Sequence, residues 1–208
     1  KIEMKQMRIS VRKGDIMHFL EELSHIFDIV AGEREIDFIV NLEDTEEEVW
    51  FSPSKLERIL YNLLSNAFKY TQPGGYVKLS AKLIKEEKGT FVQISVKDNG
   101  RGIPKEAQEQ IFESYYQVEK RDHREGFGLG LSLTRSLIHM HKGEIRVESE
   151  VNKGSDFIVT LNVSENAYNP DERSSENITT EEIQKYNQRI KETIELIPEK
   201  LTNKEKDP

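Results

Sequence analysis

The chain has 208 residues, a formal net charge of −8 and no cysteine. The length suffices for one substantial core plus an appendage, and the lack of cysteine excludes disulfide bonds and cysteine-ligated zinc. The negative charge argues against sequence-independent binding to nucleic acid or anionic lipid, and no apolar stretch approaches the roughly 20 residues of a membrane helix. We therefore expect no nucleic-acid partner and no direct membrane contact from this segment.

The hydrophobic pattern predicts alternating strands and helices. In chain order, the predicted elements are a helix over 15–31, strands over 36–42 and 49–51, a helix over 53–71, strands over 76–84 and 91–97, a short helix over 103–112, a helix over 131–141 and strands over 144–150 and 155–163. Because the strands alternate in polarity and helices lie between them, they indicate one mixed, mostly antiparallel sheet covered on one face by helices. The predicted fold class is an α+β, two-layer α/β sandwich.

Composition divides the chain into three parts. Residues 1–14 are charged and end in a glycine, and we expect them to end an element whose body lies upstream. Residues 15–163 hold nearly all the strong periodic patterns. Residues 164–208 begin with a polar stretch containing Asn and Pro, which predicts a linker, and continue into an amphipathic helix over 179–197. The apolar stripe of this helix is narrow, so we expect the helix to leave the domain instead of packing on it.

The helix over 53–71 carries Asn62 and Asn66 one turn apart, with Lys69 just beyond. Asparagine is a poor residue for the interior of a helix, and here both lie in one narrow sector beside the apolar face. An amide oxygen is an uncharged ligand that suits Mg²⁺ already bound to phosphate, and Lys69 could act as a point charge on a phosphate. The alternative is that all three are ordinary polar residues on a solvated flank.

The segment "VKDNGRGIP" is the second motif. Asp98 ends a predicted strand, and its carboxylate could accept a hydrogen bond from the exocyclic amine of a purine. Gly100 and Gly102 would let the backbone approach a flat ring and adopt positive φ. Asp-Asn-Gly is also a good hairpin turn, although a helix and not a pairing strand follows it.

The segment "GFGLG" is the third motif, and it lies directly before a helix. Exposed N–H groups at a helix start can cradle an anion, and the glycines Gly126, Gly128 and Gly130 would let a phosphate reach them. The spacing is not that of a dinucleotide-binding fold, and no P-loop sequence occurs. The alternative is a flexible glycine hinge.

Together and in this order, the motifs resemble those of the catalytic ATP-binding domain of bacterial sensor histidine kinases. "LERILYNLLSNAFKYT" is similar to that family's asparagine box, "DNGRGIP" to its first glycine box, "IFESYYQV" to its phenylalanine box and "GFGLGLSL" to its second glycine box. The resemblance covers about residues 15–163, and "KIEMKQM" is similar to the end of the family's dimerisation helix. It implies the Bergerat ATP-binding fold, with ATP held between the asparagine helix and a mobile lid over about 112–130.

The resemblance also implies a role for each matching residue. Asn66, assisted by Asn62, would hold Mg²⁺, and Asn66, Lys69 and Arg124 would serve catalysis. The implied phosphate contacts are Lys69, Arg121, Arg124, Gly126, Gly128 and Gly130. The implied contacts to the base and the rest of the nucleotide are Tyr70, Asp98, Gly100, Gly102, Ile103, Tyr116, Phe127, Leu129 and Leu131. Phe127 and Asp156 depart from the residue types usual in the family, which puts lid packing and affinity in doubt.

The reaction implied is transfer of the γ-phosphate of ATP to a histidine. In the family an acidic residue follows that histidine, whereas the five histidines here precede Phe19, Ile26, Arg124, Met140 and Lys142. The acceptor is therefore expected on a dimerisation domain that is absent from this chain. The resemblance further implies a homodimeric parent, a response regulator receiver domain as partner, and a cytoplasmic location as part of a membrane-anchored sensor.

Two other functions remain open on the sequence. One is an ATPase of the same superfamily, which would need a catalytic carboxylate on the asparagine helix. The nearest carboxylate is Glu57, about 140° around the helix from Asn62. The other is a non-catalytic module that senses nucleotide, in which bound ATP only sets a docking surface.

Overall fold

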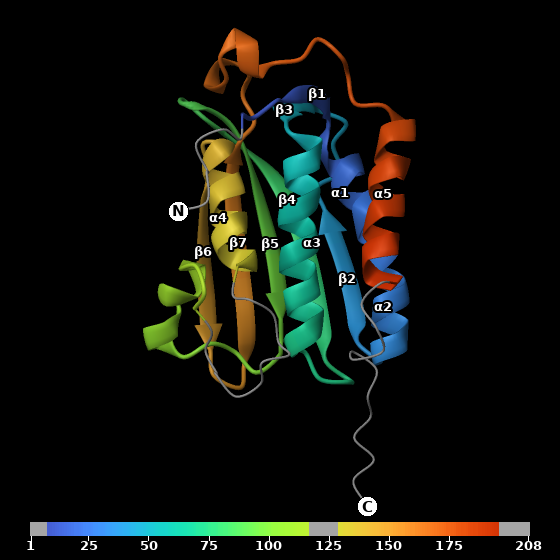
Figure 1. Ribbon diagram of the computed structural model, residues 1–208, viewed down its shortest axis with the longest axis vertical. Coiled ribbons are helices and arrows are strands. Elements are labelled where there is room, and N and C mark those ends of the chain that lie inside the picture. Colours follow the sequence, from blue (N-terminus) through green and yellow to red (C-terminus); the bar gives the residue numbers. More distant parts are fainter. Residues whose placement is uncertain (1–7, 117–128, 196–208) are drawn as a thin grey trace, which may run out of the picture.

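A computed structural model describes residues 8–116 and 129–195 of the chain, and Figure 1 shows two layers, with the helices gathered on one face of a sheet. The sheet has five strands in the order β2-β4-β5-β7-β6. Its bounds are Asp37–Leu42 for β2, Tyr76–Glu86 for β4, Gly89–Asp98 for β5, Gly154–Asn162 for β7 and Glu144–Glu150 for β6. Only the β2–β4 pair is parallel. The predicted two-layer sandwich with a mixed, mostly antiparallel sheet is confirmed.

The helical layer contains α1 (Ile16–Ser24), α2 (Ile26–Arg34), α3 (Pro53–Tyr70), α4 (Gly130–Met140) and α5 (Thr180–Glu195). The apolar face of α3 is buried as the pattern predicts, and together with α1 it packs on the inward side chains of the sheet to form the core. α3 lies over β4 and β5, and α4 lies over β6 and β7 (Figure 1). This arrangement sets α3 and α4 side by side, with the start of α4 facing α3.

A second, two-stranded sheet pairs β1 (Arg12–Asp15) with β3 (Glu48–Phe51) in antiparallel register. The part of the expected connector that the structure describes, residues 8–14, is thus extended and belongs to the fold. The expected end of a dimerisation helix, "KIEMKQM", lies outside the described residues.

Two predicted helices differ in form. The helix expected over 15–31 divides at His25 into α1 and α2, and the Ser24 hydroxyl donates to the carbonyl of Glu21 just before the division. The helix expected over 103–112 is two short 3₁₀ turns, η2 (Lys105–Ala107) and η3 (Gln110–Phe112). Two further 3₁₀ turns, η4 (Glu165–Ala167) and η5 (Pro170–Glu172), follow β7.

The expectation that the C-terminal helix leaves the domain is wrong. Its stripe is narrow, but α1, α2 and α3 together offer a matching groove, and α5 lies against all three (Figure 1). Ile183 and Ile190 join the main core, with Ile190 only 1% exposed. The ring of Tyr186 meets Phe19 edge-on at 5.8 Å between centroids. None of the helices in the described ranges combines the length and the apolar character needed to cross a membrane.

Candidate nucleotide site

The asparagine stripe of α3 faces the start of α4. Asn62 Nδ2 donates to Thr134 Oγ1 at 2.8 Å, and this bond fixes the side-chain amide. Asn62 Oδ1 then lies toward Gly130, where a Cβ atom would come within 2.5 Å of it. Asn66 and Lys69 follow on the C-terminal half of α3, and both are partly exposed. The structure therefore joins two motifs that are far apart in the sequence, the asparagine helix and the last glycine of "GFGLG".

The N-terminus of α4 is open. Leu129 occupies the cap position without a side-chain hydrogen bond to the first turn, and both Leu129 and Gly130 are exposed, whereas Leu131 is partly buried. The first N–H groups of an eleven-residue helix carry partial positive charge and favour an anion. Beside them lies the amide oxygen of Asn62, a suitable ligand for Mg²⁺ that carries phosphate. The two groups together fit a metal-bound phosphate.

Asp98 ends β5 and is buried, with 4% of its surface exposed. Its Oδ1 accepts the N–H of Gly100 at 2.8 Å. Burial raises the pKa of the Asp98 carboxyl, although backbone hydrogen bonds from Gly100 and Ser155 favour the charged form. A carboxylate held in this buried position can still accept a ligand N–H, and a ligand without that donor leaves part of its accepting capacity unused.

The glycines of "DNGRGIP" are needed for a reason that the motif alone does not reveal. A Cβ at Gly100 would lie 2.2 Å from the carbonyl oxygen of Tyr70, and a Cβ at Gly102 would lie 2.0 Å from that of Glu150. Gly102 also has a φ of +68°. The glycines thus let the loop pass between the end of α3 and the β6–β7 turn. The space that their missing side chains leave is taken by the protein's own backbone and not by a ligand ring.

Further bonds hold the same loop in place. The N–H of Ile103 donates to Ser149 Oγ at 2.8 Å, and the N–H of Asn152 donates to the carbonyl of Arg101 at 2.8 Å. Gly154, which the sequence interpretation missed, has a φ of +104° and would place a Cβ 2.0 Å from the carbonyl oxygen of Asp98. The sequence "NKGS" around Gly154 is typical of a turn, so a turn could have been predicted there. The contact could not, because Asp98 lies more than fifty residues away in the sequence.

Two cationic side chains lie beside the ring of Tyr70. The guanidinium carbon of Arg101 lies 4.3 Å from the ring centroid and Lys69 Nζ lies 5.0 Å from it. Both distances suit cation–π attraction. Arg101 was also missed from the sequence, although it stands inside "DNGRGIP". Two cationic side chains therefore lie beside this ring at the C-terminal end of α3.

The start of the phenylalanine-box segment lies beside α4. Phe112 packs edge-on against Phe157 with 6.4 Å between centroids, and Arg135 lies 5.9 Å from its ring. Tyr116 is partly buried against the core. The remaining expected lid residues, Arg121, Arg124, Gly126, Phe127 and Gly128, lie outside the described residues.

Glu57 lies on the other flank of α3. It lines a cavity of about 420 Å³ between α3 and α5, together with Arg58, Tyr61 and Arg189. Burial raises the pKa of Glu57, and the charge of Arg189 opposes that effect. A carboxylate in this position faces α5, whereas Asn62 faces α4, so Glu57 is badly placed to activate water at the start of α4.

Comparison with known proteins identifies the family and the fold. The family described as "Histidine kinase-, DNA gyrase B-, and HSP90-like ATPase" matches residues 51–165, more than half of the chain. "Histidine kinase P4" of Formosa agariphila is 30% identical over 216 aligned residues. The aligned region covers 99% of the chain and 15% of that protein. "Sensor histidine kinase WalK" of Bacillus subtilis is 34% identical over 163 residues, covering 77% of the chain and 26% of WalK. The chain thus spans a minor part of these relatives.

Solved structures share the fold. Full-length ShkA in complex with AMPPNP superposes with a TM-score of 0.65 at 28% identity, covering 74% of the chain and 31% of ShkA. The catalytic domain of histidine kinase ThkA superposes with a TM-score of 0.64 at 25% identity, covering 79% of the chain and all of that domain. The chain therefore belongs to the histidine kinase-, DNA gyrase B- and HSP90-like ATPase family, as an ATP-binding catalytic domain of the sensor histidine kinase type.

Proposed function

We propose that the domain binds Mg²⁺-ATP between α3 and the start of α4 and transfers the γ-phosphate to a histidine outside this chain. The observation that carries the proposal is the orientation of Asn62. Thr134 holds its amide so that Oδ1 faces Gly130 at the open N-terminus of α4. The candidate metal ligand, Asn62 Oδ1, thereby lies next to the candidate anion site, the first N–H groups of α4. At the other end of the site, the buried Asp98 supplies the acceptor for the amine of adenine.

In this proposal each residue binds or orients a part of the nucleotide. Asp98 accepts from adenine, and Tyr70 and Ile103 border the base. Lys69 and the first N–H groups of α4 contact the phosphates, and Asn62 and Asn66 hold the metal. When bound, Mg²⁺ neutralises negative charge on the phosphate oxygens, which is most of what phosphoryl transfer requires of a catalyst.

The chemical step needs an in-line acceptor. A ring nitrogen of the acceptor histidine forms a bond to the γ-phosphorus while the bond from that phosphorus to its bridging oxygen breaks, and ADP leaves. The lid arginines, Arg124 first and Arg121 as the alternative, would balance the charge that shifts toward the bridging oxygen. Gly126, Phe127, Gly128, Leu129, Leu131 and Tyr116 would complete the nucleotide contacts from the lid side.

The proposal assigns the parts of the chain and its partners. Residues 15–163 carry every proposed nucleotide contact, residues 1–14 would lead in from the dimerisation domain, and α5 stays docked on the domain. The parent would be a homodimer that passes its phosphate to a receiver domain of a response regulator, on the cytoplasmic side of a membrane-anchored sensor. The similarity to WalK, which is named as a sensor histidine kinase, supports the assignment of the parent as a sensor kinase.

Labelling with γ-labelled ATP tests the proposal. The chain alone is expected to bind ATP without becoming labelled, because none of its histidines has the acceptor context. A separately produced dimerisation domain with its acceptor histidine should gain acid-labile label when the chain is added. Arg124→Ala should reduce transfer more than binding, and Arg121→Ala serves as the comparison, since equal effects would leave the lid arginine unassigned. Stoichiometric acid-labile label on the chain alone would contradict the proposal, and phosphate release without any transfer would favour an ATPase.

A further inference from the structure

The C-terminal segment occupies both edges of the small β1–β3 sheet. At the edge of β3, the N–H of Trp50 donates to the carbonyl of Val163 at 3.0 Å. At the edge of β1, the N–H of Val11 donates to the carbonyl of Glu172 at 2.8 Å, and the N–H of Ser174 donates to the carbonyl of Val11 at 2.9 Å. The chain that leaves β7 therefore passes around this sheet and returns along β1.

Between these two contacts lies a separate small core. Ile9, Val11 and Tyr168 are buried together, apart from the main core, and Trp50 packs against them. The hydroxyl of Tyr168 donates to the carbonyl of Asn162 at 2.5 Å. The hydroxyl and the ring of Tyr168 thus bind the C-terminal segment both to the end of β7 and to the connector that enters the domain.

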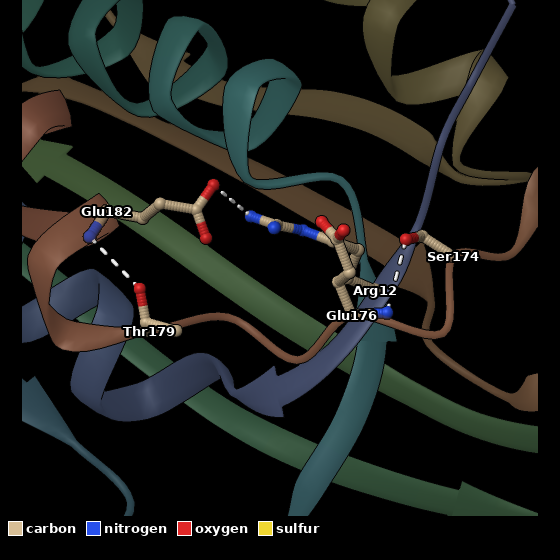
Figure 2. A network of polar contacts seen from close by, with 5 residues as sticks. All are labelled: Arg12, Ser174, Glu176, Thr179 and Glu182. Carbon is tan, nitrogen blue, oxygen red and sulfur yellow. Dashed lines mark hydrogen bonds and ion pairs between the residues drawn. The ribbon is translucent and has the colours of Figure 1, made fainter.

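A polar contact adds the helix α5 to this arrangement, and Figure 2 shows it. Arg12 Nη2 lies 2.7 Å from Glu182 Oε1, and the Arg12 side chain is only 13% exposed. The N–H of Glu182 donates to Thr179 Oγ1 at 3.3 Å, so the carboxylate stands in the first turn of α5. The hydrogen bond from Arg12 lowers the pKa of Glu182. The pair joins residues 170 positions apart.

Close packing supports the ion pair on the same edge. The N–H of Ile178 donates to the carbonyl of Lys13 at 3.3 Å. A Cβ at Gly14 would lie 2.9 Å from Ile178 Cδ1, so the glycine lets the two segments approach. From there α5 continues into the main core through Ile183 and Ile190.

From these contacts we propose that residues 163–190 form a C-terminal clasp that holds residues 8–15 on the domain. A sheet of two four-residue strands is marginal by itself, so the order of the connector depends on the clasp. The segment that enters the domain, residues 8–15, and the segment that follows β7, residues 163–190, are then physically coupled. Undocking α5 releases the connector, and a change imposed on either end reaches the other. This inference goes beyond the proposed phosphoryl transfer and does not rest on it.

Hydrogen exchange of the 208-residue chain tests the proposal. Arg12→Ala and Glu182→Ala should each speed amide exchange in residues 9–14 and 172–179 by about tenfold, equivalent to about 1.4 kcal/mol. Exchange in β5 should stay unchanged. The double variant Arg12→Glu with Glu182→Arg should recover most of the protection. Lys153→Ala is the matched control, because it breaks an ion pair with the same 2.7 Å separation that is exposed and far from the clasp.

Truncation after Val163 is the stronger perturbation. Residues 9–14 should then exchange nearly as fast as an unfolded chain, while the amides of β5 remain protected. Unchanged protection of residues 9–14 in the single variants would overturn the proposal. Equal acceleration in β5 and in residues 9–14 would also overturn it, because it would show general destabilisation without a local clasp. The single variants decide the question even if the truncated chain does not fold.

Discussion

Replacing Gly102 by alanine tests how the loop that follows β5, the proposed base-binding loop, is held. Gly102 has a φ of +68°, where a non-glycine residue costs about 1–2 kcal/mol. The added Cβ would lie 2.0 Å from the carbonyl oxygen of Glu150, which also accepts the N–H of Lys153 at 3.0 Å. Relief of the clash requires the loop or the turn to move and weakens that hydrogen bond, which contributes about 1 kcal/mol.

Together these effects predict a loss of about 2–3 kcal/mol for Gly102→Ala. For a chain of this length, such a loss lowers the melting temperature by about 4–12 °C. The loop that moves follows Asp98 directly, so the carboxylate should shift relative to the proposed position of adenine. We expect the Kd for Mg²⁺-ATP to rise at least about tenfold, since displacements near 1 Å have large effects at binding sites.

Gly74→Ala is the matched control. Gly74 has a similar φ of +79°, but a Cβ there would meet nothing within 4 Å. The control should lose only the conformational part, about 1–2 kcal/mol, and should keep its ATP affinity. Scanning calorimetry gives the stabilities and titration calorimetry gives Kd. Equal melting temperatures for the two variants, with unchanged ATP affinity in both, would refute the argument that Gly102 is required by contact with Glu150.

Three further predictions follow from burial. Asp98→Asn should weaken adenine nucleotides more than guanine nucleotides in titration calorimetry, and equal losses would remove Asp98 from base recognition. Ile190→Ala should cost about 2–5 kcal/mol and lower the melting temperature, whereas Ile39→Ala, at a 45% exposed position, should have little effect; an unchanged melting temperature in Ile190→Ala would mean that α5 does not dock. Burial lowers the pKa of His141 from 6.5 to about 4, so its neutral form contributes stability that is complete above pH 6.5 and is lost as the pH falls toward 4. Denaturant titrations should show this part of the loss as about 1.4 kcal/mol between pH 8 and pH 5.5; it should be absent in His141→Gln and retained in the control His18→Gln.

The sequence by itself determined the elements whose signals are local. The apolar stripe of α3 predicted the helix, and the alternation in residues 144–150 and 155–163 predicted the final hairpin. These predictions hold because hydrophobic period and motif spacing lie within single segments. The motifs also sufficed for the family, since their order along the chain is specific even though each one is weak alone.

The tertiary structure alone decided the features that need two distant segments at once. Gly102 is required because of the carbonyl of Glu150, and Gly154 because of the carbonyl of Asp98. Neither requirement can be seen in the sequence next to the glycine. The stripe of α5 was too narrow to indicate a core helix, and its burial depends on a groove made by three other helices. Nothing in the local sequence distinguishes Arg12 and Glu182 from other charged residues. Only the docking of α5 beside β1 brings them together as an ion pair. Surface complementarity between remote segments is a property of the folded chain, and no local pattern encodes it.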